Sequence, residues 1–168
     1  MDKFYKKISF DRAREKAMRY CSVQERCEFD VLNRFRAWNV DEKDYDIILD
    51  YLIDENFLNQ ERYVEAFIRG KFRIKSWGRN KIKIGLIAKR TFNEEQFDRV
   101  FNAEIEEEEY LGTLFKLIEK KSFLLVEEDV FAKRDKIYRY MLTKGYESEL
   151  VIIQMNAICS VGNYFSNP

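Results

Sequence analysis

An acid-free basic tract is the part of this sequence best suited to binding chemistry. Between Ala66 and Asn93 there are nine lysines and arginines and no aspartate or glutamate. Over the whole chain the two classes balance at 30 residues each, so the tract is a segregated positive field. Such fields attract polyanions and acidic protein surfaces. Because no acid lies nearby in the sequence to pair with these cations, we interpret them as binding residues.

The candidate binding residues are the cations of the basic tract and its tryptophan. Contacts from lysine and arginine to phosphates give affinity without sequence preference, and that affinity weakens with salt. Aromatic side chains among cations can stack on unpaired bases, but an aromatic residue at a helix junction is more often part of the core. The set is Arg69, Lys71, Arg73, Lys75, Trp77, Arg79, Lys81, Lys83, Lys89 and Arg90.

Two helices are predicted to position this set. The first spans residues 59–71 and places apolar side chains on one face, with Asn59 as its N-terminal cap. The second starts near Gly78 and is expected to bury Ile82, Leu86 and Ile87. That face would leave Arg79, Lys83 and Arg90 directed outward.

A helix-entry signature that recurs along the chain predicts the fold. An apolar residue precedes a polar cap, and the apolar helical pattern follows, at Asp41, Asn93 and Glu147. The second cap follows the first by 52 residues and the third follows the second by 54. A period near 50 residues containing three helical segments indicates tandem helical repeats. We therefore predict an all-α protein of three tandem three-helix repeats, covering 11–57, 58–104 and 105–160.

Local patterns refine the first and third repeats. In the first, a helix is predicted over 11–21, and Ser22 with Glu25 resembles a capping box that opens a second helix ending near Trp38. In the third, the acidic cluster Glu104 and Glu106–Glu109 falls at a helix start, where carboxylates meet the positive end of the helix dipole. The following helix is predicted over 129–144, with Gly145 as the residue that ends it.

The composition excludes most catalytic chemistry. The chain has no histidine, and its three cysteines, Cys21, Cys27 and Cys159, form no metal-binding or disulfide pattern. No glycine-rich phosphate loop is present. No signal peptide or membrane span is visible in the sequence. We expect a cytoplasmic protein that is not an enzyme and has no cofactor, no metal and no membrane association.

Several motifs give the chain a family resemblance. Residues 16–22 (KAMRYCS) with Glu25 and Arg26, residues 57–69 (FLNQERYVEAFIR), Gly78 with Lys81 and Ile82, and residues 144–146 (KGY) are similar to signatures of the RecX family of recombinase regulators. The similarity extends over about residues 13–155, with the spacing between motifs kept.

The resemblance implies an elongated, curved arrangement of three helical repeats and a non-enzymatic role in DNA repair and recombination. It implies binding, as a monomer, to the filament of RecA on single-stranded DNA, with contact to the DNA itself left open. Such a protein would inhibit the recombinase, ATPase and co-protease activities of RecA. The alternative is a helical DNA-binding protein of helix-turn-helix character that acts alone.

Overall fold

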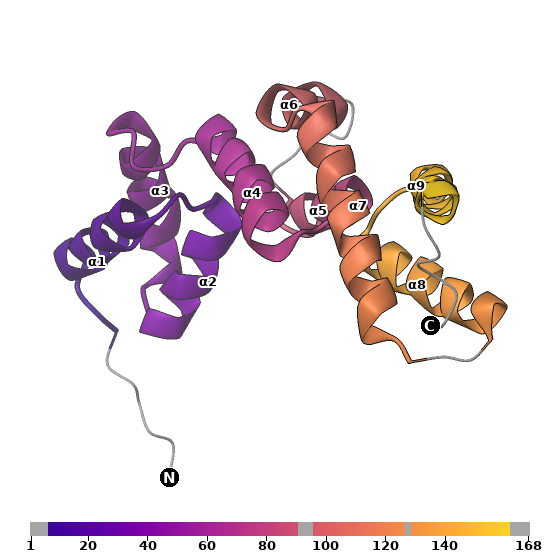
Figure 1. The fold of residues 1–168 in the computed structure, drawn as a ribbon. Helices are drawn as coiled ribbons and strands as arrows, with labels where there is room; N and C mark the ends of the chain where they lie inside the picture. Colours follow the sequence, from indigo (N-terminus) through magenta and orange to yellow (C-terminus); the bar gives the residue numbers. More distant parts are fainter. Residues whose placement is uncertain (1–6, 91–95, 127–128, 162–168) are drawn as a thin grey trace, which may run out of the picture. The chain divides into compact units, whose positions relative to one another are not determined.

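Every regular element in the residues that the structure describes is helical. The computed structural model describes residues 7–90, 96–126 and 129–161 (Figure 1). The helices are α1 (Phe10–Val23), α2 (Glu28–Trp38), the 3-10 turn η1 (Glu42–Asp44), α3 (Tyr45–Asp54), α4 (Gln60–Lys75), α5 (Arg79–Ile87), α6 (Phe97–Glu104), α7 (Glu107–Leu124), α8 (Val130–Lys144) and α9 (Ser148–Val161). The predicted all-α class is confirmed, and the nine α-helices of these ranges follow one another as three sets of three.

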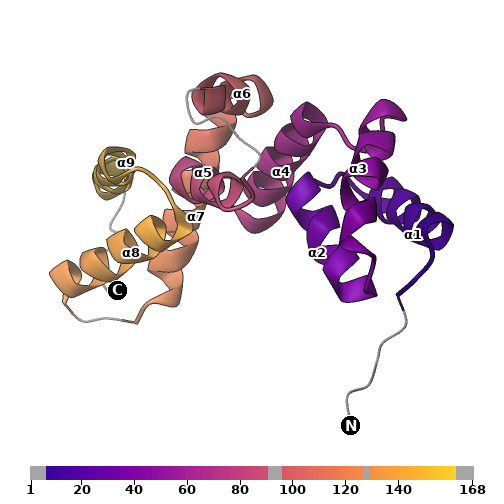
Figure 2. The ribbon, with the colours of Figure 1, turned by 180° about the vertical axis from the view of Figure 1, so that it is seen from behind.

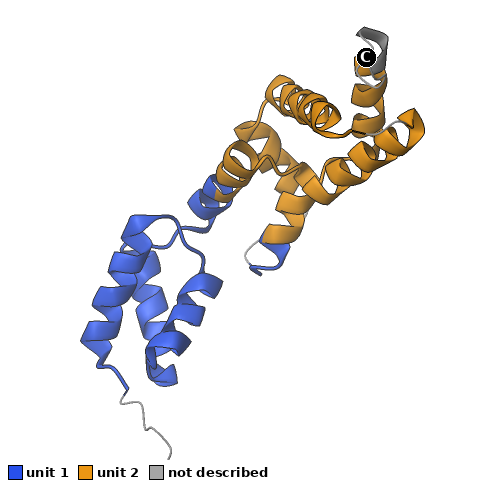
Figure 3. Cartoon of the chain, turned by 60° about the horizontal axis from the view of Figure 1, so that its bottom comes forward, with its two compact units in different colours: residues 1–66, 86–93 blue, residues 67–85, 94–168 orange. Residues whose placement is uncertain are grey.

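The chain forms two compact units (Figure 3). Unit 1 contains residues 1–66 and 86–93, and unit 2 contains residues 67–85 and 94–168. The division falls inside α4 and near the end of α5. The basic tract is therefore shared between the two units.

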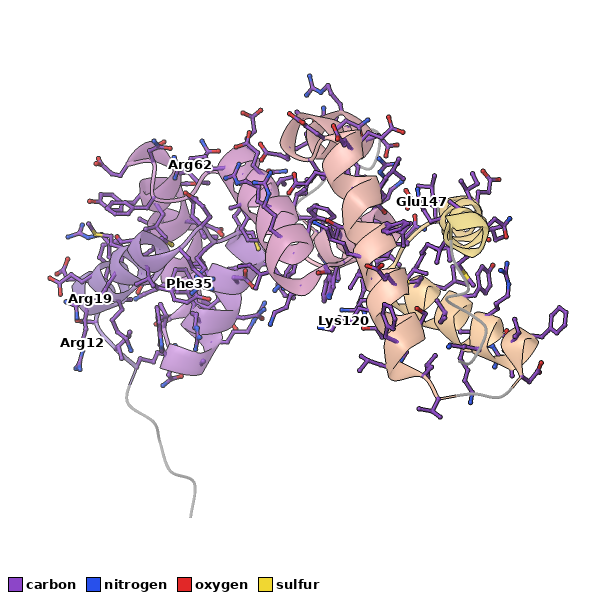
Figure 4. The ribbon with its side chains drawn as sticks, viewed as in Figure 1. Arg12, Arg19, Phe35, Arg62, Lys120 and Glu147 are labelled. Carbon is purple, nitrogen blue, oxygen red and sulfur yellow. The ribbon has the colours of Figure 1, made fainter. Side chains whose placement is uncertain are left out.

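Unit 1 is built around the apolar faces of α1, α2 and α3. Ala17, Val31, Phe35, Ile48 and Leu52 are fully buried, and Phe35 points into the helical cluster in Figure 4. These are the positions that helical periodicity places on one face of each helix. Unit 1 therefore has a hydrophobic core of its own.

The start of α4 is fixed by the cap that the sequence predicts. The side-chain Oδ1 of Asn59 accepts a hydrogen bond from the backbone N–H of Arg62 at 3.0 Å. The Arg62 side chain in turn donates to Oε1 of Glu25 at 3.0 Å and to Oδ1 of Asn56 at 2.6 Å. Asn59 thus satisfies one of the N–H groups that a helix start leaves without an intrahelical partner.

The predicted capping box at Ser22 is wrong. α1 continues through Ser22 to Val23, and α2 begins only at Glu28. The Ser22 hydroxyl donates to the carbonyl oxygen of Met18 at 2.8 Å, four residues earlier in the same helix. A serine that bonds back into its own helix is not available as a cap for the next one. The predicted end of the second helix at Trp38 is confirmed.

Unit 2 is centred on the ring of Tyr110 in α7. Its centroid lies 5.7 Å from that of Phe72, 5.5 Å from that of Phe101 and 5.2 Å from that of Tyr146. These rings come from α4, α6 and the α8–α9 connection, and all are almost fully buried. Contacts of this kind each add stability beyond the area that they bury. One aromatic cluster therefore joins four segments that are far apart in the sequence.

The start of α5 meets the end of α8 through their backbones. Gly78 N–H donates to Lys144 C=O at 2.8 Å, and Asn80 N–H donates to Gly145 C=O at 3.0 Å. Gly145 ends α8 with φ of 92°, as the sequence predicts for this position. A Cβ on Gly78 would collide with the backbone of Gly145, and a Cβ on Gly145 would collide with Lys81. Only glycine permits this close approach at either position.

A few further sequence predictions can be compared with the structure. Ile87, which was expected to be buried, is 45% exposed and is the last residue of α5. The helix entry predicted at Asn93 lies outside the described residues. α6 is first seen from Phe97.

We expect Gly145→Ala to destabilise unit 2. The native φ at this position is strained for any residue with a Cβ, and the added methyl group would also displace Lys81, so the loss should be about 1–3 kcal/mol. This loss of unfolding free energy is measured by urea unfolding monitored with circular dichroism.

Gly112→Ala is the matched control. Gly112 lies inside α7 and an added Cβ there meets no atom within 4 Å. The helix should gain about 0.5–1 kcal/mol, since alanine is the better helix former. Equal changes in the two variants would contradict the close-approach role of Gly145.

Candidate interaction surface

Arginines and lysines alternate along the second half of α4. Arg69, Lys71, Arg73 and Lys75 are spaced two residues apart. Positions two apart on a helix point about 200° apart, whereas positions four apart share a side. The two arginines therefore lie on one side of α4 and the two lysines on the opposite side.

The arginine side of α4 is paired with the acidic cluster. Nη1 of Arg69 lies 2.7 Å from Oε2 of Glu104. Arg73 donates through Nε and Nη2 to the two carboxylate oxygens of Glu109, both at 3.0 Å. No acid lies near these arginines in the sequence, but the fold supplies an acidic partner to each of them. Residues 35 and 36 positions later in the sequence supply the carboxylates.

Arg79 is also a structural residue, and its predicted outward orientation is wrong. Its Nη1 lies 3.0 Å from Oε1 of Glu147, and its guanidinium carbon lies 4.8 Å from the centroid of the Phe101 ring. The Tyr110 hydroxyl accepts from the Arg79 backbone N–H at 3.0 Å and donates to Oε2 of Glu147 at 2.6 Å. Burial, followed by the Glu147 contact, raises the pKa of Tyr110, so the hydroxyl keeps its proton. Arg79 thus ties α5 to α7 and α9.

The lysines of the tract gather around Trp77. The Lys71 ammonium lies 4.9 Å from the Trp77 ring centroid, and the Lys81 ammonium lies 5.0 Å from it. Lys81 Nζ also donates to Thr143 C=O at 2.8 Å, and Lys144 Nζ donates to Lys75 C=O at 3.1 Å. Lys81 therefore caps the C-terminal end of α8, and Lys144 caps the C-terminal end of α4.

We call Lys71, Lys75, Lys81 and Lys144 the lysine face. Within the described residues, none of the four forms an ion pair with a carboxylate. Lys75 is exposed and the side chains of Lys71 and Lys81 are half-buried. Because lysine held by a ring or a carbonyl keeps its full charge, this face stays electropositive. Sequence analysis missed Lys144, and the KGY motif at 144–146 was the available signal.

The other predicted binding residues lie outside the lysine face. They are Lys83, Lys89 and Arg90. Lys83 lies 5.9 Å from the Phe97 ring centroid in unit 2. Lys89 and Arg90 belong to unit 1, where Lys89 Nζ lies 2.6 Å from Oδ1 of Asp30. Arg90 is exposed at the end of α5. The structure therefore places Lys71 and Lys81 over Trp77 and pairs Arg69, Arg73 and Arg79 with carboxylates.

The described ranges contain neither a metal-binding cluster nor a membrane-spanning helix. No group of three or more histidine, cysteine, aspartate or glutamate side chains there could hold a metal ion. None of the helices there is long and apolar enough to cross a bilayer.

These features define a helical-repeat protein with a cationic surface, and comparison with known proteins identifies its family. Residues 59–90 match the family model for the second three-helix domain of RecX, and residues 107–152 match the model for the third. Regulatory protein RecX of Clostridium perfringens strain SM101 is 33% identical over 143 residues, which cover 84% of this chain and 66% of that protein. The chain belongs to the RecX family.

Other relatives extend the comparison. Regulatory protein RecX of Acinetobacter baylyi is 24% identical over 151 residues, covering 90% of this chain and 91% of that protein. The crystal structure of RecX from Lactobacillus salivarius shares the fold with a TM-score of 0.73 at 21% identity, covering 88% of this chain and 95% of that one. The chain spans about two thirds (66%) of the length of the clostridial relatives that it matches.

The Arg73–Glu109 pair predicts a pH dependence of stability. The hydrogen bond from Arg73 lowers the pKa of Glu109 below its ordinary value of 4.5. A lowered folded-state pKa gives stability that is present above the ordinary value and lost as the pH falls through the folded value. Glu109→Gln should therefore lower the urea midpoint near pH 6, and its difference from the unaltered chain should shrink as the pH falls below about 4.

Glu108→Gln is the control, since Glu108 is exposed in the same helical turn and the structure gives it no ion pair. It should change the midpoint less than Glu109→Gln near pH 6. If the deficit of Glu109→Gln were the same at every pH, the ion pair would not be the cause.

Proposed function

We propose that this chain is a regulator of RecA that binds the RecA filament on single-stranded DNA and inhibits its recombinase, ATPase and co-protease activities. Membership of the RecX family supports the regulatory role, and the relatives carry the name regulatory protein. The observation that carries the assignment of a contact surface is the lysine face, whose four ammonium groups have no carboxylate partner among the described residues. We propose that the protein acts in the cytoplasm, as a monomer and without a cofactor.

We further propose that the three repeats cover residues 11–57, 58–104 and 105–160. The two domain models match within the second and third of these ranges. The three successive sets of three α-helices agree with the same division. Each repeat would then present its own outer surface to a long, regular partner such as a filament.

The lysine face is the part of the predicted site that we assign to partner binding. A cation already paired with a carboxylate gains little from a new anionic partner, because the first pair must be broken. Arg69, Arg73 and Arg79 are in that state. The ammonium groups of the lysine face lack that cost. We therefore expect the lysines, more than the arginines, to set affinity for an acidic or polyanionic filament surface.

We predict that Lys71→Gln with Lys75→Gln weakens inhibition of RecA. Two cations lost from the rim of an interface should weaken binding roughly three- to ten-fold. The double substitution should also reduce the salt dependence of filament binding. The measurement is the DNA-dependent ATPase of RecA against increasing concentrations of each variant.

The matched control is Lys116→Gln with Lys120→Gln on α7. Both lysines are exposed, as Figure 4 shows for Lys120, and both changes remove the same charge. If the two double variants lost inhibition equally at equal folded fraction, total charge and not the lysine face would determine binding.

Tighter binding to naked DNA than to preformed filaments would favour the stand-alone DNA-binding alternative.

A further inference from the structure

A second cationic surface lies in unit 1, apart from the basic tract. It is formed by α1, the α1–α2 connection and α2. Lys16 Nζ lies 4.4 Å from the Trp38 ring centroid, and the guanidinium carbons of Arg26 and Arg34 lie 4.0 Å and 5.0 Å from that of Tyr20. The Tyr20 and Trp38 rings contact each other edge-on at 6.0 Å. Two aromatic rings thus hold three cations in place.

The outer side of α1 extends this row of charge. Arg12, Lys16 and Arg19 are spaced at i, i+4 and i+7, within about 60° of one another around the helix. The buried residues of α1, Ala13, Ala17 and Cys21, occupy the opposite side. Figure 4 shows Arg12 and Arg19 both directed away from the core of unit 1. We call Arg12, Lys16, Arg19, Arg26 and Arg34 the α1–α2 cation row.

No ion pair joins a member of this row to a carboxylate of the described residues. Residues 10–38 contain seven basic and five acidic side chains. Three of the acids are engaged by other cations: Asp11 by Arg14, Glu25 by Arg62 and Asp30 by Lys89. With Arg14 set aside, six basic residues remain against Glu15 and Glu28. An aromatic ring fixes a cation without cancelling its charge, so the row is both ordered and positive.

We propose that the α1–α2 cation row binds the phosphate backbone of a single nucleic-acid strand. A line of cations, rather than one point charge, suits a linear polyanion. The exposed Arg34 guanidinium, stacked on the Tyr20 ring, keeps its N–H edge available for bidentate contact with phosphate oxygens. Cations already cover Tyr20 and Trp38, so these rings are not available to stack on bases. The row therefore contacts phosphates and has no base preference. This site is independent of the lysine face and of the proposed regulation of RecA.

The test measures binding of a fluorescent oligothymidylate to the full chain by anisotropy over a series of salt concentrations, with no other protein present. Lys16→Gln with Arg34→Gln should weaken binding about ten-fold and reduce the slope of log affinity against log salt by roughly 1.4, at about 0.7 per lost phosphate contact. Arg12→Gln with Arg19→Gln should do the same, and these exposed side chains contribute nothing to packing that the structure shows. The second pair keeps the test informative if the first pair disturbs folding.

The control pair is Arg36→Gln with Lys43→Gln, which removes two exposed cations of unit 1 that lie outside the row. Its affinity should stay within about two-fold of the unaltered chain, because neither residue contacts the strand. Equal losses in test and control pairs, or no loss in either test pair, would overturn the proposal. Displacement of the oligonucleotide by polyglutamate at equal charge concentration would assign the row to an acidic protein segment instead. Since the assay contains no RecA, its failure leaves the ATPase experiment on the lysine face unaffected.

Discussion

The backbone contact between the start of α5 and the end of α8 is the constraint on which unit 2 depends. A helix start leaves N–H groups without partners, and a helix end leaves carbonyl groups without partners. Here Gly78 and Asn80 N–H meet the carbonyls of Lys144 and Gly145, while Arg79 N–H meets the Tyr110 hydroxyl. The positive end of one helix dipole thus faces the negative end of another. Figure 2 shows α5, α7 and α8 close to one another, seen from behind.

This junction explains why the basic tract has two kinds of cation. With α5 seated on α8, α4 passes beside the end of α6 and the start of α7, and its arginine side meets Glu104 and Glu109. Its lysine side is left beside Trp77 and the end of α8. Arginine suits the paired positions because its planar group can bond two carboxylate oxygens at once, as Arg73 does with Glu109. Lysine at the other positions keeps its charge without a carboxylate partner, as Lys71 does over the Trp77 ring.

The sequence alone was sufficient for the parts of the fold that depend on local chemistry. Asn59 as a cap, Gly145 as a helix end and the burial of Ile82 and Leu86 in α5 follow from spacing and side-chain type. The roles of Arg69, Arg73 and Arg79 could not be predicted in this way, because their partners lie 35 to 68 residues away. The predicted cap at Ser22 was wrong for the opposite reason, since a local hydrogen bond from Ser22 to Met18 competes with capping. Lys144 was missed because its role depends on α8 ending beside α4.

The central claim is that the arginines of the basic tract hold the fold and the lysines bind the partner. Arg79→Lys tests it most directly, because it keeps the charge but removes the fork that bonds Glu147. Urea unfolding and binding to preformed RecA filaments should be measured in parallel on this one variant. The account predicts a lower unfolding midpoint, with filament affinity of the folded protein within about two-fold of the unaltered chain. An unchanged midpoint together with a large loss of filament affinity would contradict it.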